Sequence, residues 1–195
     1  GGNCGNNRQG VADFLGFVDR VGAPVNYLCY SGHNSARAAA GVAGPYEAAT
    51  RAQAQDMADI VARDLVAGAI GLSYGLEYSP AVTMEEMAGV AAGAKGRPML
   101  LAAHYRSDGP DGVRSVEELV ALSAATDQPM QVSHLVSCSA FGSMAESLAT
   151  LERAVSRGVD VLADSYPYEA FCTRIGSAVF DDGCLERWNK GYDAI

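Results

Sequence analysis

Hydrophobic residues recur along the chain in short runs that alternate with longer amphipathic stretches. We interpret the short runs as buried strands, over residues 25–30, 69–73, 99–104, 130–134 and 159–163. The stretches between them predict helices over residues 11–21, 46–66, 84–94, 116–125 and 144–156. Strand and helix candidates therefore follow one another over most of the chain.

Residues at the ends of these stretches support the helix assignments. Ser115 and Glu118 have the spacing of a capping box, and Gly68 and Gly158 stand where helices are expected to end. Within residues 144–156, helical spacing predicts one buried stripe made of Met144, Leu148, Leu151 and Val155.

The alternation predicts parallel strands covered by helices, because a parallel crossover needs about a dozen residues and usually contains a helix. A closed (β/α)8 barrel and an open doubly wound sheet both fit this pattern. Five strand candidates, or six if one ends at Cys4, are too few for a complete barrel, which typically needs about 250 residues. The chain starts without methionine, and we expect its natural start to be missing.

Composition limits the classes of protein that this chain can represent. A net charge of -9 without clustered Lys and Arg argues against nucleic-acid binding. No apolar run reaches the roughly 18 residues that a transmembrane helix needs, so we expect no membrane partner. The five cysteines form no dense framework, which favours a reducing compartment and a cytoplasmic location.

The three histidines of the chain, His33, His104 and His134, all follow strand candidates closely. The carboxyl ends of parallel strands form the active-site face of α/β folds, so these histidines are site candidates. Cys4 joins them if the residues before it end an earlier strand. Thiolate and imidazole are the usual zinc donors, and the wide spacing suits ligands from separate strands and excludes a zinc finger. A cysteine nucleophile with His104 or His134 as its base remains an alternative.

Six segments, in order, resemble the motifs of one family of enzymes. They are Gly2-Asn3-Cys4-Gly5, residues 32–37 (GHNSAR), residues 68–78 (GAIGLSYGLEY), His104-Tyr105-Arg106, Val132-Ser133-His134 and residues 164–168 (DSYPY). The sequence thereby resembles the D-aminoacylase family, which includes N-acyl-D-amino-acid and N-acyl-D-glutamate deacylases, within the amidohydrolase superfamily.

The resemblance implies an α/β fold, a partial (β/α)8 TIM-type barrel of the metal-dependent amidohydrolase kind with about five to six β/α units. Residues 1–195 would form the central part of this catalytic barrel, with residues 169–195 as an irregular or truncated end.

The resemblance also implies roles for individual residues. Zinc would be held by Cys4, His104 and His134, and Tyr166 would bind and polarise the substrate. His33 would shape the site without binding the metal. Arg106 would take part in substrate binding or in a supporting ion pair. Cys172 stands where some relatives have a serine that contacts the substrate carboxylate.

The implied activity is zinc-dependent hydrolysis of N-acyl-D-amino acids to a carboxylate and a D-amino acid. The family's His-x-His pair and late aspartate are not visible here, and Val136 replaces a lysine that contributes to binding of the substrate carboxylate. A fragment inactive alone, with a metal-binding or structural role, is therefore an alternative. Cyclic-amide hydrolysis is another, disfavoured because residues 69–78 contain no lysine. Open barrel edges predict self-association.

Overall fold

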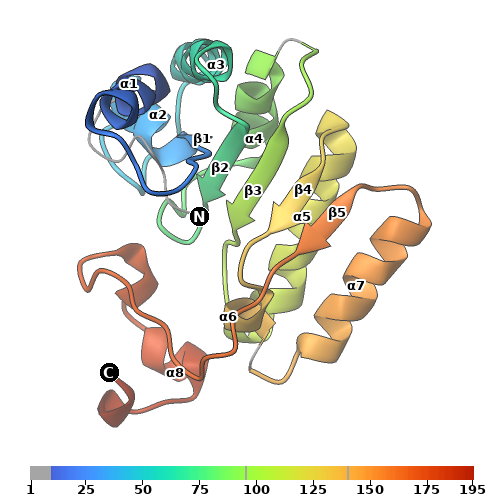
Figure 1. Ribbon diagram of the computed structural model, residues 1–195. Helices are drawn as coiled ribbons and strands as arrows, with labels where there is room; N and C mark the ends of the chain where they lie inside the picture. The colour runs from blue at the N-terminus through green and yellow to red at the C-terminus, as the bar shows by residue number, and fades with distance from the viewer. Residues whose placement is uncertain (1–9, 95, 140) are drawn as a thin grey trace. The chain divides into compact units, whose positions relative to one another are not determined.

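The computed structural model describes residues 10–94, 96–139 and 141–195 and confirms the α/β class (Figure 1). In this part of the chain five strands form one sheet in the order β1-β2-β3-β4-β5, with parallel pairing of β1 to β2 and of β4 to β5. The strands are β1 (Tyr30–Gly32), β2 (Gly71–Gly75), β3 (Leu100–His104), β4 (Met130–Val132) and β5 (Val161–Ala163). A parallel sheet with helical connections is the arrangement predicted for part of a (β/α)8 barrel.

Helices connect successive strands at nearly all the predicted places. The α-helices are α1 (Val11–Val21), α2 (His33–Ala39), α3 (Arg51–Val66), α4 (Met84–Ala91), α5 (Gly112–Thr126), α6 (Leu135–Ser139), α7 (Met144–Ser156) and α8 (Cys184–Trp188). Short 3-10 helices are η1 (Ala92–Ala94), η2 (Gly109–Asp111), η3 (Ala178–Phe180) and η4 (Tyr192–Ala194). Among the described residues, no helix is both long enough and apolar enough to cross a membrane.

The chain divides into two compact units, and the division falls within β2 and β3. The first unit contains the described residues up to Tyr74 together with Ala81–Ala102. The second contains Gly75–Pro80 and Ala103–Ile195, and so includes the carboxyl-terminal tips of β2 and β3. The residues that follow these tips belong to the same unit as β4, β5 and their helices.

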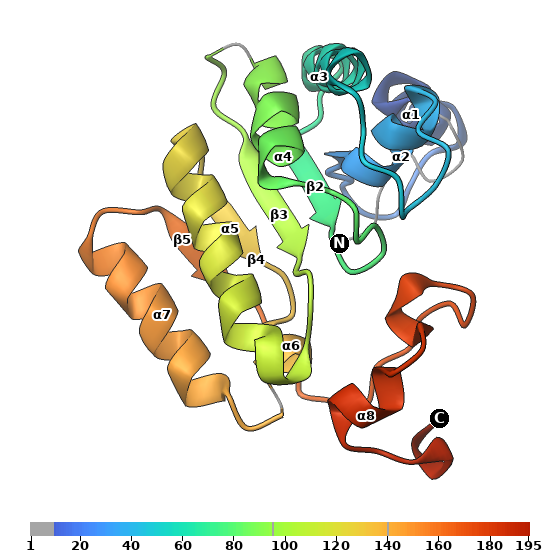
Figure 2. The same cartoon turned by 180° about the vertical axis from the view of Figure 1, so that it is seen from behind.

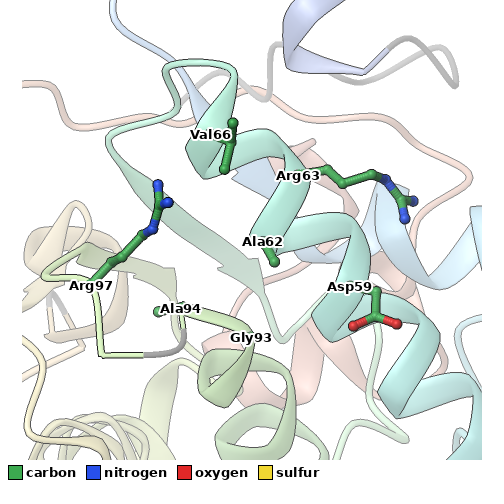
Figure 3. A pocket seen from close by; sticks show the side chains of 7 residues that line it. All are labelled: Asp59, Ala62, Arg63, Val66, Gly93, Ala94 and Arg97. Atoms are coloured by element: carbon green, nitrogen blue, oxygen red, sulfur yellow. The ribbon is translucent and has the colours of Figure 1, made fainter.

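In the first unit, α3 begins at a capping box that the sequence analysis did not identify. The Thr50 hydroxyl accepts a hydrogen bond from the backbone of Gln53, whose side chain accepts one from the Thr50 backbone N–H. These contacts satisfy backbone groups that a helix terminus otherwise leaves without partners. Helix α3 then buries Met57 and Val61 completely. Figure 3 shows η1, with Gly93 and Ala94, beside this helix.

The first strand differs from its prediction. Residues 25–30 were expected to be a buried strand, but pairing with β2 starts only at Tyr30, opposite Gly71. Val25 and Leu28 are more than half exposed. This apolar run is therefore not buried in the sheet, and composition alone gave the wrong boundary.

In the second unit, α5 and α7 pack against each other and along β4 and β5, as both views show (Figures 1 and 2). Helix α7 is where it was predicted, but its buried face is not. Leu151 is buried as expected, together with Ser147 and Ala154, whereas Leu148 and Val155 are exposed. The hydroxyl of Ser139 donates a hydrogen bond to that of Ser147, which allows this polar residue to be buried.

The capping box predicted at Ser115 is also wrong. Helix α5 already begins at Gly112, and the Ser115 hydroxyl donates to the carbonyls of Ser107 and Asp111. The predicted helix ends at Gly68 and Gly158 are confirmed, because both glycines have positive φ and follow α3 and α7 closely.

Residues 169–195 contain only short helices, yet they have a hydrophobic cluster of their own. Val179, Cys184 and Trp188 are buried together, and Tyr78, from the connection after β2, packs against them. Tyr78 also shares a hydrogen bond of 2.8 Å with the hydroxyl of Thr173. The segment is thus packed against other residues of the second unit, to which it belongs.

Candidate metal and active site

His104 and His134 lie at the carboxyl ends of β3 and β4. His104 is the last residue of β3, and His134 comes two residues after the end of β4. A hydrogen bond from the Ser133 backbone N–H to the Ala103 carbonyl joins the carboxyl end of β4 to that of β3. The two rings face each other, with His104 Nδ1 3.0 Å from His134 Nε2. The structure therefore brings together two of the residues predicted to bind zinc.

The backbone of His134 has an unusual conformation, with a φ of 41°. This left-handed region is unfavourable for residues other than glycine, and such residues concentrate at functional sites. The carboxylate of Asp164, directly after β5, accepts a hydrogen bond from the His134 backbone N–H and another from the Gln131 side chain. These contacts hold the strained residue and direct its ring towards His104.

The geometry of the two rings fits a shared metal ion. Two nitrogens bound to one tetrahedral zinc at about 2.0–2.1 Å are roughly 3.3 Å apart, close to the observed spacing. Burial, together with the charge of a protonated His104, lowers the pKa of His134 to about 4, so this ring is neutral near pH 7. Neutral imidazole is the form that binds metals.

The third predicted ligand, Cys4, lies outside the described residues. Among the residues that are described, no group of three or more His, Cys, Asp or Glu side chains is arranged to hold a metal ion. Glu77 is close, but its Oε2 lies 2.7 Å from Nε2 of His104, the nitrogen that does not face His134. The described part of the site thus supplies two candidate ligands, and Glu77 contacts one of them.

A pocket of about 590 Å³ opens beside the two histidines within the second unit. Much of its wall is aromatic, formed by Tyr78, Tyr105, Tyr166, Tyr168 and Phe171. Tyr166 lines this pocket, and its hydroxyl is hydrogen-bonded to that of Ser137. Cys172 also lines the pocket and is solvent-exposed. Two further residues of the predicted site are therefore placed beside the histidine pair.

Arg106 is not among the residues that line this pocket. Its guanidinium group makes a bidentate contact with Glu118, from Nε at 2.9 Å and from NH2 at 2.8 Å, and also donates to the Pro80 carbonyl. Bidentate pairing of this kind fixes the direction of an arginine side chain. This geometry favours the supporting ion pair over the contact with substrate.

His33 belongs to the first unit, where it is fully buried at the start of α2. Its Nε2 lies 3.1 Å from Glu86 Oε1, and Arg37 donates a hydrogen bond to the same oxygen. Burial acts to raise the pKa of Glu86, but the contacts with His33 and Arg37 outweigh it and lower the pKa below 4.5. His33 thus takes part in a buried charge cluster that fixes α2 to α4.

The cysteines of the described residues bear on the alternative of a cysteine nucleophile. Burial raises the pKa of the Cys138 thiol to about 12, with Asp108 and Glu77 adding to the shift, so this thiol is protonated and unreactive. Cys29 and Cys184 are also buried. The cysteine named in that alternative, Cys4, lies outside the described residues, so the alternative stays a prediction.

Three further residues line the pocket without having been predicted from the sequence: Glu77, Asp108 and Ser137. Glu77 follows the end of β2 by two residues, as the histidines follow their strands. The rule that selected the histidines would have selected Glu77 as well. Ser137 lies on the short helix α6 and gave no comparable signal.

A second hollow, of about 500 Å³, lies in the first unit beside α3 and η1 (Figure 3). Its charged residues are Asp59, Arg63 and Arg97, and it is lined by neither histidine nor cysteine. Figure 3 shows the Arg97 guanidinium group on one side of α3, near Val66, and the Arg63 guanidinium group on the other side. The hollow therefore lacks a converging set of groups comparable with that around His104.

The parallel sheet and the paired histidines at its strand ends are features of the amidohydrolase type of metal-dependent hydrolase. No protein-family model matches the chain. The D-aminoacylase of Alcaligenes xylosoxydans xylosoxydans is 33% identical over 168 residues, which are 84% of this chain and 34% of that protein.

Solved structures agree with this relationship. A D-aminoacylase described as defining a novel subset of amidohydrolases superposes with a TM-score of 0.73 at 31% identity, over 82% of this chain and 34% of that one. The N-acyl-D-glutamate deacylase of Bordetella bronchiseptica, solved with zinc and a phosphonate inhibitor, also superposes with a TM-score of 0.73 at 31% identity, over 82% of this chain and 34% of that one. The chain is a homologue of the D-aminoacylase and N-acyl-D-glutamate deacylase family, and it spans about a third of the length of these relatives.

Proposed function

We propose that this chain forms the central part of the active site of a zinc-dependent enzyme that hydrolyses N-acyl-D-amino acids. The observation that carries the proposal is the 3.0 Å approach of His104 Nδ1 to His134 Nε2 beside an aromatic pocket. It is supported by similarity to deacylases, one of which was solved with zinc. Cys4 is proposed as the third ligand.

A zinc ion held by these residues would activate a water molecule and polarise the amide carbonyl. The chain's own contribution is to place donors around the substrate. The Tyr166 hydroxyl is proposed to donate a hydrogen bond to the amide oxygen as negative charge develops there, which is worth about 3 kcal/mol in comparable sites. Ser137, hydrogen-bonded to the same hydroxyl, keeps Tyr166 turned towards the pocket.

The aromatic wall excludes water from one side of the reacting bond and offers a surface to the acyl group or the amino-acid side chain. Cys172 is proposed to contact the substrate because it lines the same pocket. The products would be a carboxylic acid and a free D-amino acid. A proton for the leaving amine must come from a further acid, and we assign that role to no residue of this chain.

The test is hydrolysis of N-acetyl-D-amino acids, compared with their L-enantiomers, by the zinc-loaded chain and by the full-length gene product. Release of the D-amino acid by the full-length product supports the proposal, and inactivity of the chain alone then marks it as an incomplete active site. Zinc binding without hydrolysis by either protein favours the alternative of a metal-binding or structural role.

Two further expectations accompany this proposal. We propose that the chain self-associates, because β5 ends the described sheet order and Leu162 on it is 66% exposed. We also propose a reducing, cytoplasmic location, which is supported by the thiols of Cys138, Cys172 and Cys184, which form no disulfide among the described residues.

A further inference from the structure

Glu77 makes a contact that determines which ring nitrogen of His104 carries a hydrogen. It is buried, with 7% of its surface exposed, and its Oε2 lies 2.7 Å from His104 Nε2. An ionised carboxylate can only accept a hydrogen bond, so the hydrogen must reside on His104 Nε2. In a neutral imidazole this leaves the lone pair on Nδ1, the nitrogen that faces His134.

We propose that Glu77 is a positioning residue that selects the metal-binding tautomer of His104, and that Arg187 on α8 holds Glu77 in place. This inference rests on the proposed function, because it concerns the same metal site. It extends the site to a carboxylate and an arginine to which no role has been given so far.

Arg187 reaches the site through a buried aspartate. Its Nε lies 2.7 Å from Asp108 Oδ1, while Trp188 Nε1 donates to Asp108 Oδ2 at 2.5 Å. Asp108 is only 4% exposed, so both donors of α8 are fixed by one desolvated carboxylate. The short helix α8 is thereby fixed in direction as well as in position.

From this anchor, Arg187 NH2 extends to within 3.6 Å of Glu77 Oε1. Glu77 Oε1 is buried and makes no hydrogen bond with any described residue. The arginine cation is therefore the charge that compensates this side of the carboxylate, while His104 occupies the other side. Without Arg187, Glu77 would gain by turning towards water and would release the His104 ring.

A purely structural role for this network is the competing interpretation. Buried ion pairs contribute little net stability, because the cost of desolvation offsets their attraction. A carboxylate behind a metal-binding histidine, in contrast, typically changes metal affinity by about 10–100-fold. The two interpretations therefore predict different results for tautomer state and metal affinity at temperatures where the protein remains folded.

The first test replaces Glu77 by Gln, with Glu117→Gln on the exposed face of α5 as the matched control. Nitrogen-15 NMR of the metal-free protein reports the hydrogen position on each histidine ring. We expect His104 to be protonated on Nε2 in the wild type and in the control, and to be a mixture of tautomers in Glu77→Gln. Unchanged tautomer populations in Glu77→Gln would overturn the inference.

The second measurement is zinc affinity, from competition with a chelator well below the unfolding temperature. We expect Glu77→Gln to lower affinity about 10-fold or more, Glu77→Asp to recover part of the loss, and Glu117→Gln to stay within about twofold. If Glu77→Gln fails to fold, Glu77→Asp alone decides: aspartate is one methylene shorter and approaches His104 Nε2 less closely, so zinc binding should still weaken, and unchanged affinity contradicts the inference.

The third variant, Arg187→Met, keeps the aliphatic stem and removes the charge. We expect roughly a threefold or larger loss of zinc affinity together with a mixed His104 tautomer, whereas Arg153→Gln on α7 should change neither. Wild-type protein that binds no zinc would contradict the proposed function. The tautomer measurement on metal-free protein still decides the role of Glu77 in that case.

Discussion

The carboxylate of Asp164 accepts a hydrogen bond from the backbone N–H of His134, and so links the first residue after β5 to the second residue after β4. This contact holds His134 in a left-handed backbone conformation, with φ at 41°. A residue held in this way carries a conformational cost of about 1 kcal/mol or more. We therefore expect the strain to be retained for the position that it gives to the imidazole ring.

Replacement of His134 by Asn tests this exchange between stability and function. Asparagine adopts the left-handed conformation more readily, so we expect the free energy of unfolding of the metal-free protein to stay within about 1 kcal/mol or to rise. Zinc affinity should fall at least about 100-fold, because an imidazole ligand is lost. Urea titration and chelator competition measure the two effects. Retained zinc affinity would rule out His134 as a ligand.

The acid dependence of stability should reflect Glu86. Its folded pKa lies below 4.5, so its contribution is fully present above that pH and is lost as the pH falls through the folded value. We expect Glu86→Gln to reduce stability near pH 7 by about 3 kcal/mol, since the buried Arg37 loses its charged partner.

The difference between wild type and Glu86→Gln should shrink below pH 4.5, as Glu86 becomes protonated in both the folded and the unfolded wild-type chain. Urea titrations at a series of pH values measure it. Glu85→Gln, one residue away and exposed, is the control and should follow the wild type. A constant difference across this range would contradict the assignment.

Gly93 and Gly89 should respond in opposite ways to a methyl group. A Cβ at Gly93 would lie 2.2 Å from the backbone carbonyl oxygen of Ala58 on α3, whereas a Cβ at Gly89 meets nothing within 4 Å. We expect Gly93→Ala to cost about 3 kcal/mol or more, because two backbone segments must separate. Gly89→Ala, inside α4, should stabilise by about 0.5–1 kcal/mol. Thermal unfolding of both variants measures these changes in stability, and a Gly93→Ala variant as stable as the wild type would contradict the prediction.

Self-association should depend on the exposed edge strand β5. Replacing Leu162 with Lys places a charge on this strand, which should disfavour pairing with another chain. We expect the wild type to elute above its monomer mass in sizing chromatography and Leu162→Lys to shift towards the monomer. A wild-type chain that is monomeric at all concentrations would refute self-association.

Much of the fold followed from the sequence because strands and helices differ in hydrophobic period. The strands of residues 99–104 and 159–163 and the helices of residues 11–21 and 144–156 lie close to where they were predicted. The errors share a cause. Leu148 and Val155 are apolar at helical spacing but exposed, and Val25 and Leu28 form an apolar run outside the sheet. Apolar character does not by itself show which neighbour covers a residue.

The histidine pair was predictable because the carboxyl ends of parallel strands meet on one face, and both histidines stand at or just after a strand end. The Glu77–Arg187 contact was not, since it joins residues 110 positions apart through a segment with little regular structure. The left-handed conformation of His134 also left no trace in the sequence, because it depends on a hydrogen bond that its N–H donates to Asp164 at another strand end.

The most direct test of the account is zinc-edge X-ray absorption on the zinc-loaded chain, together with Cys4→Ser and His104→Gln. The account predicts one sulfur at about 2.3 Å and two imidazole nitrogens at about 2.0 Å, with the sulfur lost in Cys4→Ser and one imidazole lost in His104→Gln. A bound zinc without sulfur or without imidazole scattering, or the absence of zinc at equimolar loading, would contradict the proposed metal site.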